Sequence, residues 1–412
     1  RGKKGPLITY GFSKDHRPDL KQLLFILTTT SDGGVPIQFR SEAGNTADVR
    51  THVETWDLLR AMAKNAKFLY VADSKLCSGD AMDHIDKHGG RFVTVMPRSR
   101  MEDRHFREWI QTNEPAWEIA RDRPHPRRRR SPRDVWKVFV PKIPSSEGWP
   151  ITWVFSSLLK IRQEQSRTER LLKTEQDLAR LLHQLSGKRP RRRSRKDVEA
   201  RIEDIFKKTH CNRYVRVEVA TLQEHTYKQE HPGRPSEATR FRRKSKARLT
   251  ISWTVDQGRI LYDRKSDGMF PLLTNDRTMT PKEVLDAYKR QPMIEKRFEQ
   301  TKTVLELAPV CLKRADRIEA LFFLFFLALL VQTLLERELR RAMKRFKIES
   351  LPLYPEARRN KRPTAEQILR LFTHVQRHVL VDQGREIRTF EPEISGLQEQ
   401  VLGLIGMTGV YA

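Results

Sequence analysis

The sequence predicts an α/β fold, and two observations support this class. Residues 23–30 and 35–39 are rich in β-branched and aliphatic side chains, and Asp32-Gly33-Gly34 between them is a turn signal, so a β-hairpin is expected. After it, segments with helical spacing of apolar residues alternate with short apolar segments. These are a helix at 51–64, a strand at 67–72, a helix at 81–88 and a strand at 91–96. A strand pair followed by alternating helices and strands indicates an α/β domain with its own core, which we assign to residues 1–97.

Residues 98–268 are predicted to be a basic insertion of mixed helix and strand. Two segments rich in Arg and Pro, 127–130 with its flanks and 188–196, indicate exposed linkers. The expected elements are helices at 157–186 and 197–208 and strands at 214–221, 249–255 and 259–262.

Residues 269–345 are predicted to return to the α/β domain. A strand at 269–274 is followed by Thr280-Pro281-Lys282-Glu283, a capping box with proline at the first helical position, which is a strong helix start. The predicted helix 318–345 contains an unbroken apolar run at 320–331, too short to cross a hydrocarbon layer of roughly 30 Å. We therefore expect a core helix that is apolar and buried all round. The basic C-terminal region, 346–412, is helix-like at 365–380.

Charge and cysteine content narrow the functional class. The 412 residues include 80 Lys and Arg against 52 Asp and Glu, a net charge of +28, which indicates DNA, RNA or an anionic membrane as partner. Cys77, Cys211 and Cys311 lie far apart without a CxxC pair, which argues against a disulfide framework or a structural zinc site and favours a reducing cytoplasm. Four basic runs are expected to bind phosphates nonspecifically: Arg127–Arg130, Lys188–Lys196, Arg240–Arg248 and Arg358–Arg362. No helix-turn-helix or zinc finger assigns base recognition to a segment.

Two carboxylates are candidates for chemistry. Asp73 follows a predicted strand, where α/β sheets bind ligands and metals, although Asp-Ser there is also an ordinary turn. Glu295 belongs to a set of polar residues whose spacing places them on one helical face, or on a merely solvated stripe: Tyr288, Gln291, Glu295 and Lys302. Divalent Mg²⁺ prefers oxygen ligands, and a pair of such ions can clamp both oxygens of a phosphoryl transfer.

Several segments resemble motifs of bacterial insertion-sequence transposases of the DDE type. They are Gly11–Gln22 (GFSKDHRPDLKQ), Gly44–Asp48 (GNTAD), Val71–Ser74 around the second catalytic Asp, and Leu273–Asn275 before the Glu helix. Tyr288, Glu295 and Lys302 match the Y-(2)-R-(3)-E-(6)-K signature. The resemblance covers about residues 7–97 and 269–335 and keeps the motifs in order.

This resemblance implies a ribonuclease-H-like catalytic core split by the insertion, with a helical C-terminal region. It implies a mechanism with Mg²⁺ or Mn²⁺ that hydrolyses a phosphodiester at the element end and attacks target DNA with the freed 3′-hydroxyl. Asp73 and Glu295 carry over as catalytic metal ligands. The contacts to the DNA end are expected from Tyr288, Arg290, Gln291 and Lys302. The implied partners are double-stranded DNA, as terminal inverted repeats and target, and a second copy in a synaptic complex, with no membrane.

Three departures from the family pattern leave the activity of the chain open. Gln291 replaces the usual Arg, although Arg290 is adjacent, and Pro292 must break or kink the helix. The family's first catalytic Asp lies upstream of the GxSKD segment, so the chain, which begins at Arg1, is expected to be truncated at its N-terminus. The nearby substitutes for that ligand, which are weak, are Asp15, Asp19 and Asp32.

Three functional hypotheses follow. The first is an active DDE transposase, and the second is a catalytically inactive DNA-binding remnant, which the departures favour. An RNA-binding protein is the third, but the basic runs lack the interleaved aromatic side chains expected for stacking on bases.

Overall fold

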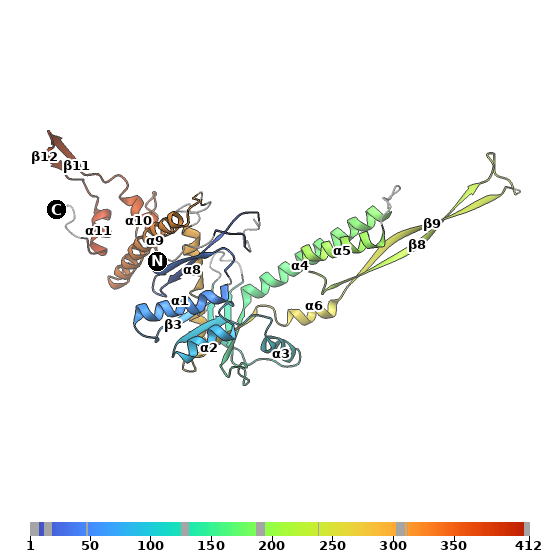
Figure 1. Cartoon of the computed structure of the whole chain (residues 1–412), viewed down its shortest axis with the longest axis horizontal. Coiled ribbons are helices and arrows are strands. Elements are labelled where there is room, and N and C mark those ends of the chain that lie inside the picture. The colour runs from blue at the N-terminus through green and yellow to red at the C-terminus, as the bar shows by residue number, and fades with distance from the viewer. Residues whose placement is uncertain are drawn as a thin grey trace. The chain divides into compact units, whose positions relative to one another are not determined.

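The structure is a computed structural model that describes residues 8–11, 19–46, 48–124, 132–186, 194–237, 239–301, 310 and 312–407 (Figure 1). Contacts between Cα atoms group the chain into two compact units, Arg1–Phe92 with Asp286–Ala412, and Val93–Leu285. The first unit contains the predicted hairpin together with Asp73, Tyr288 and Glu295. The second contains all of the region expected to be an insertion, 98–268.

The predicted hairpin of the first unit is confirmed. Strand β1 (Leu23–Thr29) pairs antiparallel with β2 (Pro36–Ala43), and the turn between them contains Gly33 and Gly34 at φ +84° and +64°. A side chain is strained at such positive φ, so the two glycines permit the turn. The rings of Phe25 and Phe39 lie 5.9 Å apart, which gives the hairpin an aromatic surface.

Helix α9 (Ala315–Arg345) packs one side against this aromatic surface. Phe322 lies 5.1 Å from Phe25, and Phe326 lies 5.2 Å from Phe39, measured between ring centroids. The hydroxyl of Ser41 on β2 donates a hydrogen bond to a Glu319 carboxylate oxygen at 2.9 Å. The hairpin therefore holds the N-terminal half of α9 through both apolar and polar contacts.

The expectation that this helix is buried all round is wrong. Leu324 is 62% exposed and Val331 is 64% exposed, because a two-stranded hairpin covers only one side of a helix. By length and composition α9 is also apolar enough to cross a membrane, and 22% of its most apolar window is buried.

The alternation of helix and strand predicted after the hairpin is also confirmed. The elements are α1 (Asp48–Ala63), β3 (Leu69–Ala72), α2 (Gly79–Lys87) and β4 (Arg91–Val95). The indole of Trp56 on α1 is fully buried, and a Cβ at Gly90 would lie 2.5 Å from its Cζ2 atom. Glycine before β4 thus allows α1 to pack closely.

The C-terminal region forms a small core with the end of α9. Its elements are α10 (Ala365–Leu371), β11 (His378–Asp382), β12 (Arg385–Phe390) and α11 (Gly396–Leu404). The helix expected at 365–380 therefore ends at Leu371, and His378–Asp382 instead pairs with β12 across a turn at Gln383 and Gly384, which both have positive φ. The shared core consists of Leu339, Met343, Leu351, Ile368 and Val401.

A six-stranded sheet has the strand order β3-β4-β10-β7-β6-β5. Strand β10 (Met269–Thr274) pairs antiparallel with both β4 and β7 (Ile151–Ser156), and β7 continues to β6 (Asp134–Phe139) and β5 (Glu118–Arg123). Helix α3 (Met101–Trp109) contributes Phe106, which stacks on Trp153 of β7 with ring centroids 3.6 Å apart. Three strands from the region expected to be an insertion thus extend the same sheet.

The remainder of the second unit is an arm made of two helices and a two-stranded ribbon (Figure 1). Helices α4 (Ser157–Ser186) and α5 (Arg195–Thr209) confirm the predicted pair. Strands β8 (Val215–Gln229) and β9 (Phe241–Val255) pair along their full length and are about twice as long as predicted. We call α4, α5, β8 and β9 the arm.

The strand predicted at 259–262 is wrong, because these residues lie in helix α6 (Gln257–Arg264). The carboxylate of Asp256 accepts a hydrogen bond from the Arg259 backbone N–H at 3.1 Å and caps the helix. An N-cap aspartate stabilises the first turn of a helix, which outweighs the strand preference of the short apolar run that follows.

Candidate active site

Asp73 lies directly after β3, in the turn that leads to α2. One of its carboxylate oxygens accepts a hydrogen bond from the Lys75 backbone N–H at 2.9 Å, and its carbonyl accepts one from Leu76 at 3.1 Å. This is the local turn geometry of an aspartate, which the sequence left open as the ordinary interpretation. The side chain is nevertheless exposed, so the turn orients a carboxylate that a ligand can reach.

The two motif segments on either side of the hairpin meet at their glycines. The Gln22 side-chain amide donates a hydrogen bond to the Gly11 carbonyl at 3.1 Å, and the backbones of Thr9 and Gln22 form an antiparallel bridge. A Cβ at Gly11 would overlap the Gly44 carbonyl, and one at Gly44 would overlap the Gln22 carbonyl. Close backbone approach therefore explains both motif glycines, while residues 12–18 between them lie outside the described residues.

The helix expected around Glu295 is interrupted, as proline predicts. Helix α7 (Pro281–Tyr288) begins with the predicted capping box, in which the Thr280 hydroxyl accepts from the Glu283 N–H at 3.3 Å. It ends at Tyr288, and α8 (Gln291–Glu299) starts anew with Pro292 in its first turn. The proposed shared helical face of Tyr288 and Glu295 is therefore wrong, because Pro292 lacks the N–H that a continuous helix needs.

Tyr288 nevertheless lies close to both candidate carboxylates. Burial raises the pKa of the Tyr288 phenol, and the negative charges of Asp73 and Glu295 raise this pKa further. Asp73 also adds to the effect of burial on Tyr70, whose pKa is raised well above its ordinary value. A carboxylate disfavours a phenolate only at short range, so Asp73, Tyr288 and Glu295 share one region of the first unit.

Of the other three predicted DNA contacts, the structure describes two, Arg290 and Gln291. Arg290 is exposed in the junction between α7 and α8, and Gln291 is the partly buried first residue of α8. Lys302 lies outside the described residues. Arg290 is therefore the cation that the described part of this signature presents to solvent beside Tyr288.

Helix α8 is fixed by a buried arginine that the sequence interpretation missed. Arg297 is 4% exposed and donates to the carbonyls of Gly33 and Gly34 in the hairpin turn, at 2.7 and 3.2 Å. It also donates to a Glu336 carboxylate oxygen on α9 at 3.1 Å. This guanidinium joins the hairpin, α8 and α9, and so sets where Glu295, two residues earlier, is held.

Glu336 completes this network from α9. Its side chain is 1% exposed, pairs with Arg340 at 3.2 Å as well as with Arg297, and accepts the Ala365 backbone N–H of α10 at 3.1 Å. Three donors around one buried carboxylate satisfy it well. The sequence signal was slight: a Glu five residues after the end of the apolar run, with Arg at the i+4 position.

The donor set suits a hard divalent cation only in part. Asp73 and Glu295 offer exposed carboxylate oxygens, the ligand type that Mg²⁺ takes from proteins in small number together with phosphate and water. Within the described ranges, no group of three or more His, Cys, Asp or Glu side chains is placed to hold a metal ion. Asp32, a weak candidate for a third ligand, pairs with Arg337 and Arg341 at 3.9 and 3.4 Å.

A strand-end and a helix-borne carboxylate that approach the same tyrosine are ligands of the kind found in metal-dependent phosphoryl-transfer proteins. The family model described as "Transposase DDE domain" matches residues 9–331, and the chain belongs to this family. The family implies DNA transposition, with DNA as substrate and a divalent metal as cofactor. No curated protein matches the chain.

Proposed function

We propose that the chain acts as the DNA transposase of a bacterial insertion sequence. It would cleave strands at the element ends and join them to target DNA, as a homodimer in a synaptic complex at the bacterial nucleoid. The proposal extends the family membership, and the observation that carries it within the chain is the approach of Asp73 and Glu295 to the Tyr288 hydroxyl. Its core would be ribonuclease-H-like, which the mixed α/β sheet supports.

Asp73 and Glu295 would be the carboxylate ligands of a Mg²⁺ or Mn²⁺ ion. When bound, the ion supplies Lewis acidity and charge neutralisation. The Tyr288 phenol is protonated at neutral pH, and burial and the two carboxylates raise its pKa further, so its O–H would donate a hydrogen bond to a phosphate oxygen of the DNA end. Arg290, which is exposed, would pair with a neighbouring phosphate, and Gln291 and Lys302 would be further contacts.

A third carboxylate would come from residues outside the described ranges. Among the described strands, β1 pairs only with β2, and β3 lies at the edge of the six-stranded sheet. Both therefore have an edge that can accept a further strand. A strand added along the free edge of β3 would run beside the β3 terminus that carries Asp73, which is where a third metal ligand is required.

The test is cleavage of DNA that carries the sequences flanking the gene on both sides, with Mg²⁺ or Mn²⁺. Strand nicks at defined positions are expected, and Glu295→Gln should abolish them while DNA binding persists. The matched control is Glu299→Gln, four residues later on α8 and also exposed, which should cleave like the wild type. If Glu295→Gln cleaves as well as Glu299→Gln, Glu295 has no part in the mechanism.

The alternative is a catalytically inactive DNA-binding remnant. The lack of a three-ligand metal group within the described residues favours it specifically. If the wild-type chain binds the flanking DNA but does not nick it with either Mg²⁺ or Mn²⁺, the remnant is supported over the enzyme.

A further inference from the structure

The outer part of the β8–β9 ribbon is exposed on both faces. We call Leu222–Gln229 paired with Phe241–Arg248 the outer ribbon. The inner part packs on α4 and α5 through a core that includes Leu181, Val198 and Ile251. Beyond it, residues 222–228 and 241–247 are all exposed, and the ribbon continues past the ends of both helices (Figure 1).

One face of the outer ribbon carries a regular row of cations. Alternate residues of a strand point to the same face about 6.8 Å apart, so β9 presents four basic side chains in line. They are Arg242, Lys244, Lys246 and Arg248. Arg248 pairs with Glu224 at 2.7 Å, whereas Arg242, Lys244 and Lys246 form no ion pair with an acidic residue in the described part of the chain.

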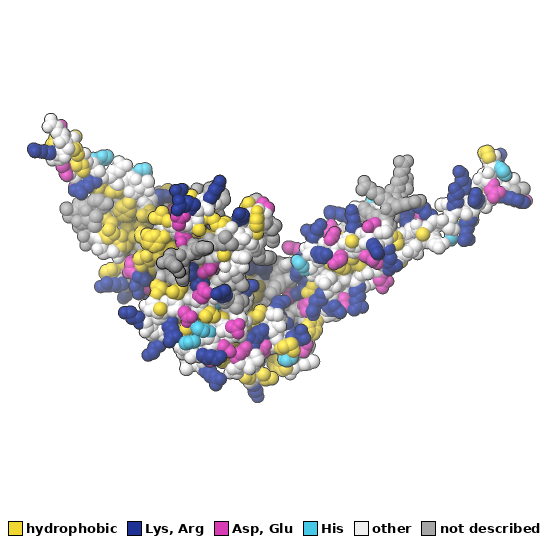
Figure 2. Space-filling model, in the orientation of Figure 1, with side chains coloured by type: hydrophobic (Ala, Val, Ile, Leu, Met, Phe, Trp, Pro, Cys, Tyr) yellow, Lys and Arg dark blue, Asp and Glu magenta, His cyan; other side chains and the backbone are white. Residues whose placement is uncertain are grey.

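The connection at the end of the ribbon adds to this charge. Residues 222–248 contain eight basic and three acidic side chains, a net charge of +5. Figure 2 shows Lys and Arg along this part of the arm. Tyr227 and Phe241, which are 64% and 51% exposed, lie on the opposite face from the cation row near the same end.

The outer ribbon receives little stabilisation from the rest of its own chain. An isolated two-stranded hairpin is at best marginally stable in water, and its strands have unpaired edges. In the outer ribbon, three of the four cations in the row, Arg242, Lys244 and Lys246, also repel one another without an acidic partner in the described part of the chain. A polyanion that contacts the row would remove the repulsion and cover the ribbon, so this surface is suited to a partner.

We propose that the outer ribbon binds duplex DNA, lying in the major groove with its cation row against the phosphates of one strand. The major groove of B-DNA, about 12 Å wide, admits a two-stranded ribbon, whereas the deep, narrow major groove of A-form RNA excludes side chains. Eight residue pairs span roughly 27 Å, about eight base pairs at 3.4 Å each. The proposal takes only its partner, DNA, from the proposed function.

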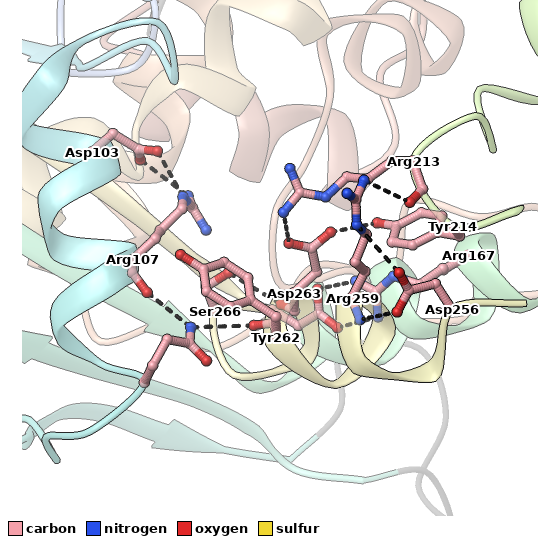
Figure 3. A network of polar contacts seen from close by, with 12 residues as sticks. Asp103, Arg107, Arg167, Arg213, Tyr214, Asp256, Arg259, Tyr262, Asp263 and Ser266 are labelled. Carbon is pink, nitrogen blue, oxygen red and sulfur yellow. Dashed lines mark hydrogen bonds and ion pairs between the residues drawn. The ribbon is translucent and has the colours of Figure 1, made fainter. Parts of the chain in front are cut away.

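The base of the ribbon is anchored by a polar network within the second unit (Figure 3). Tyr214, one residue before β8, donates through its hydroxyl to Asp263 of α6 at 2.7 Å, and Arg213 donates to the same carboxylate at 3.0 Å. Arg167 of α4 forms a buried ion pair with Asp267, just beyond α6. Tyr214 and Arg213 thus fix the start of the ribbon to α6, and the Arg167–Asp267 pair fixes the segment after α6 to α4, so an outer ribbon bound to DNA has a fixed base.

The experiment measures the affinity of the full chain for a duplex DNA of arbitrary sequence against salt concentration. Each phosphate contact contributes a slope of about −0.9 in log affinity against log salt, so Arg242→Gln/Lys244→Gln/Lys246→Gln should make the slope less negative by about 2.7. Between about 50 and 200 mM salt the wild type would then lose roughly 40-fold more affinity than this variant.

A matched variant controls for the loss of three charges. The variant Lys64→Gln/Arg104→Gln/Lys344→Gln removes three exposed cations that lie just after α1, on α3 and at the end of α9, in that order. It should keep the wild-type slope. A second variant that exchanges Arg and Lys at the ribbon positions (Arg242→Lys/Lys244→Arg/Lys246→Arg) should also keep it. Circular dichroism spectra that match the wild type establish that the variants are folded.

The outcomes separate this proposal from the proposed function. If the ribbon and control variants show the same slope, the outer ribbon is not a DNA-binding surface, while wild-type binding and metal-dependent nicking still stand. Duplex RNA is tested in the same way. If the wild type binds it as tightly as DNA, and the ribbon variant changes the salt slope for RNA by the same amount as for DNA, the ribbon is a general polyanion surface and the DNA assignment is overturned. If the wild type does not bind duplex DNA, both proposals fail.

Discussion

Replacing Arg297 with methionine is expected to loosen the helix that carries Glu295. The arginine is 4% exposed, and its partner Glu336 is 1% exposed, so the substitution leaves a buried carboxylate with fewer donors. It also removes the hydrogen bonds to the carbonyls of Gly33 and Gly34. The helix α8 would then lose its polar attachment to the hairpin and to α9.

The size of the effect can be worked out from these contacts. Removing one partner of a buried ion pair costs about 3–5 kcal/mol. Arg340 at 3.2 Å and the Ala365 N–H at 3.1 Å still satisfy Glu336, which places the cost at the lower end, about 3 kcal/mol. At 1.4 kcal/mol per factor of ten, α8 amides would exchange with solvent roughly 100-fold faster.

Native-state hydrogen exchange, read by mass spectrometry on peptides from 286–301, measures this opening directly. The control Arg341→Met removes a guanidinium that is 60% exposed and pairs with Asp32 and Glu338, and it should change stability by less than about 1 kcal/mol. Glu336→Leu, alone and combined with Arg297→Met, completes a double-mutant cycle, and the two substitutions together should cost less than the sum of their separate costs, because each removes the same ion pair. Exchange in Arg297→Met as slow as in Arg341→Met would refute the anchoring role.

Three further predictions concern electrostatics and packing. Glu295→Gln should lower the pKa of Tyr288, because it removes one of two carboxylates that raise it; an unchanged phenol titration, with Tyr288→Phe as reference, would contradict their proximity. Gly44→Ala should destabilise the first unit by about 1–3 kcal/mol through backbone overlap, seen in thermal unfolding, and a wild-type melting curve would contradict the overlap. The hydrogen bond from Arg100 lowers the pKa of Glu102 from 4.5 to about 2, so its stabilisation is complete above pH 4.5 and is lost toward pH 2. Glu102→Gln should therefore flatten acid unfolding in this window, and identical curves would argue against it.

Local sequence patterns predicted many of the elements because the causes of these elements are local. The turn glycines, the capping box at Thr280 and the break before Pro292 each act within a few residues. The prediction was wrong where a distant partner or a competing cap decides. The α9 face at Leu324 and Val331 is exposed because the hairpin reaches only one side, and the segment 259–262 is helical because Asp256 caps it.

The sequence by itself determined the family, the order of the motifs and the candidates Asp73, Tyr288 and Glu295, because these are readable as residue types at fixed spacings. Tertiary structure decided what those spacings cannot encode. The break in the helix removed the shared face of Tyr288 and Glu295, yet contacts between segments far apart in the chain placed both near Asp73. Tertiary contacts also turned Arg297 and Glu336 from ordinary charges into a buried anchor. Pairing with β8 also extended β9 back to Phe241, and the alternation of side chains along that strand then placed Arg242, Lys244, Lys246 and Arg248 in one row.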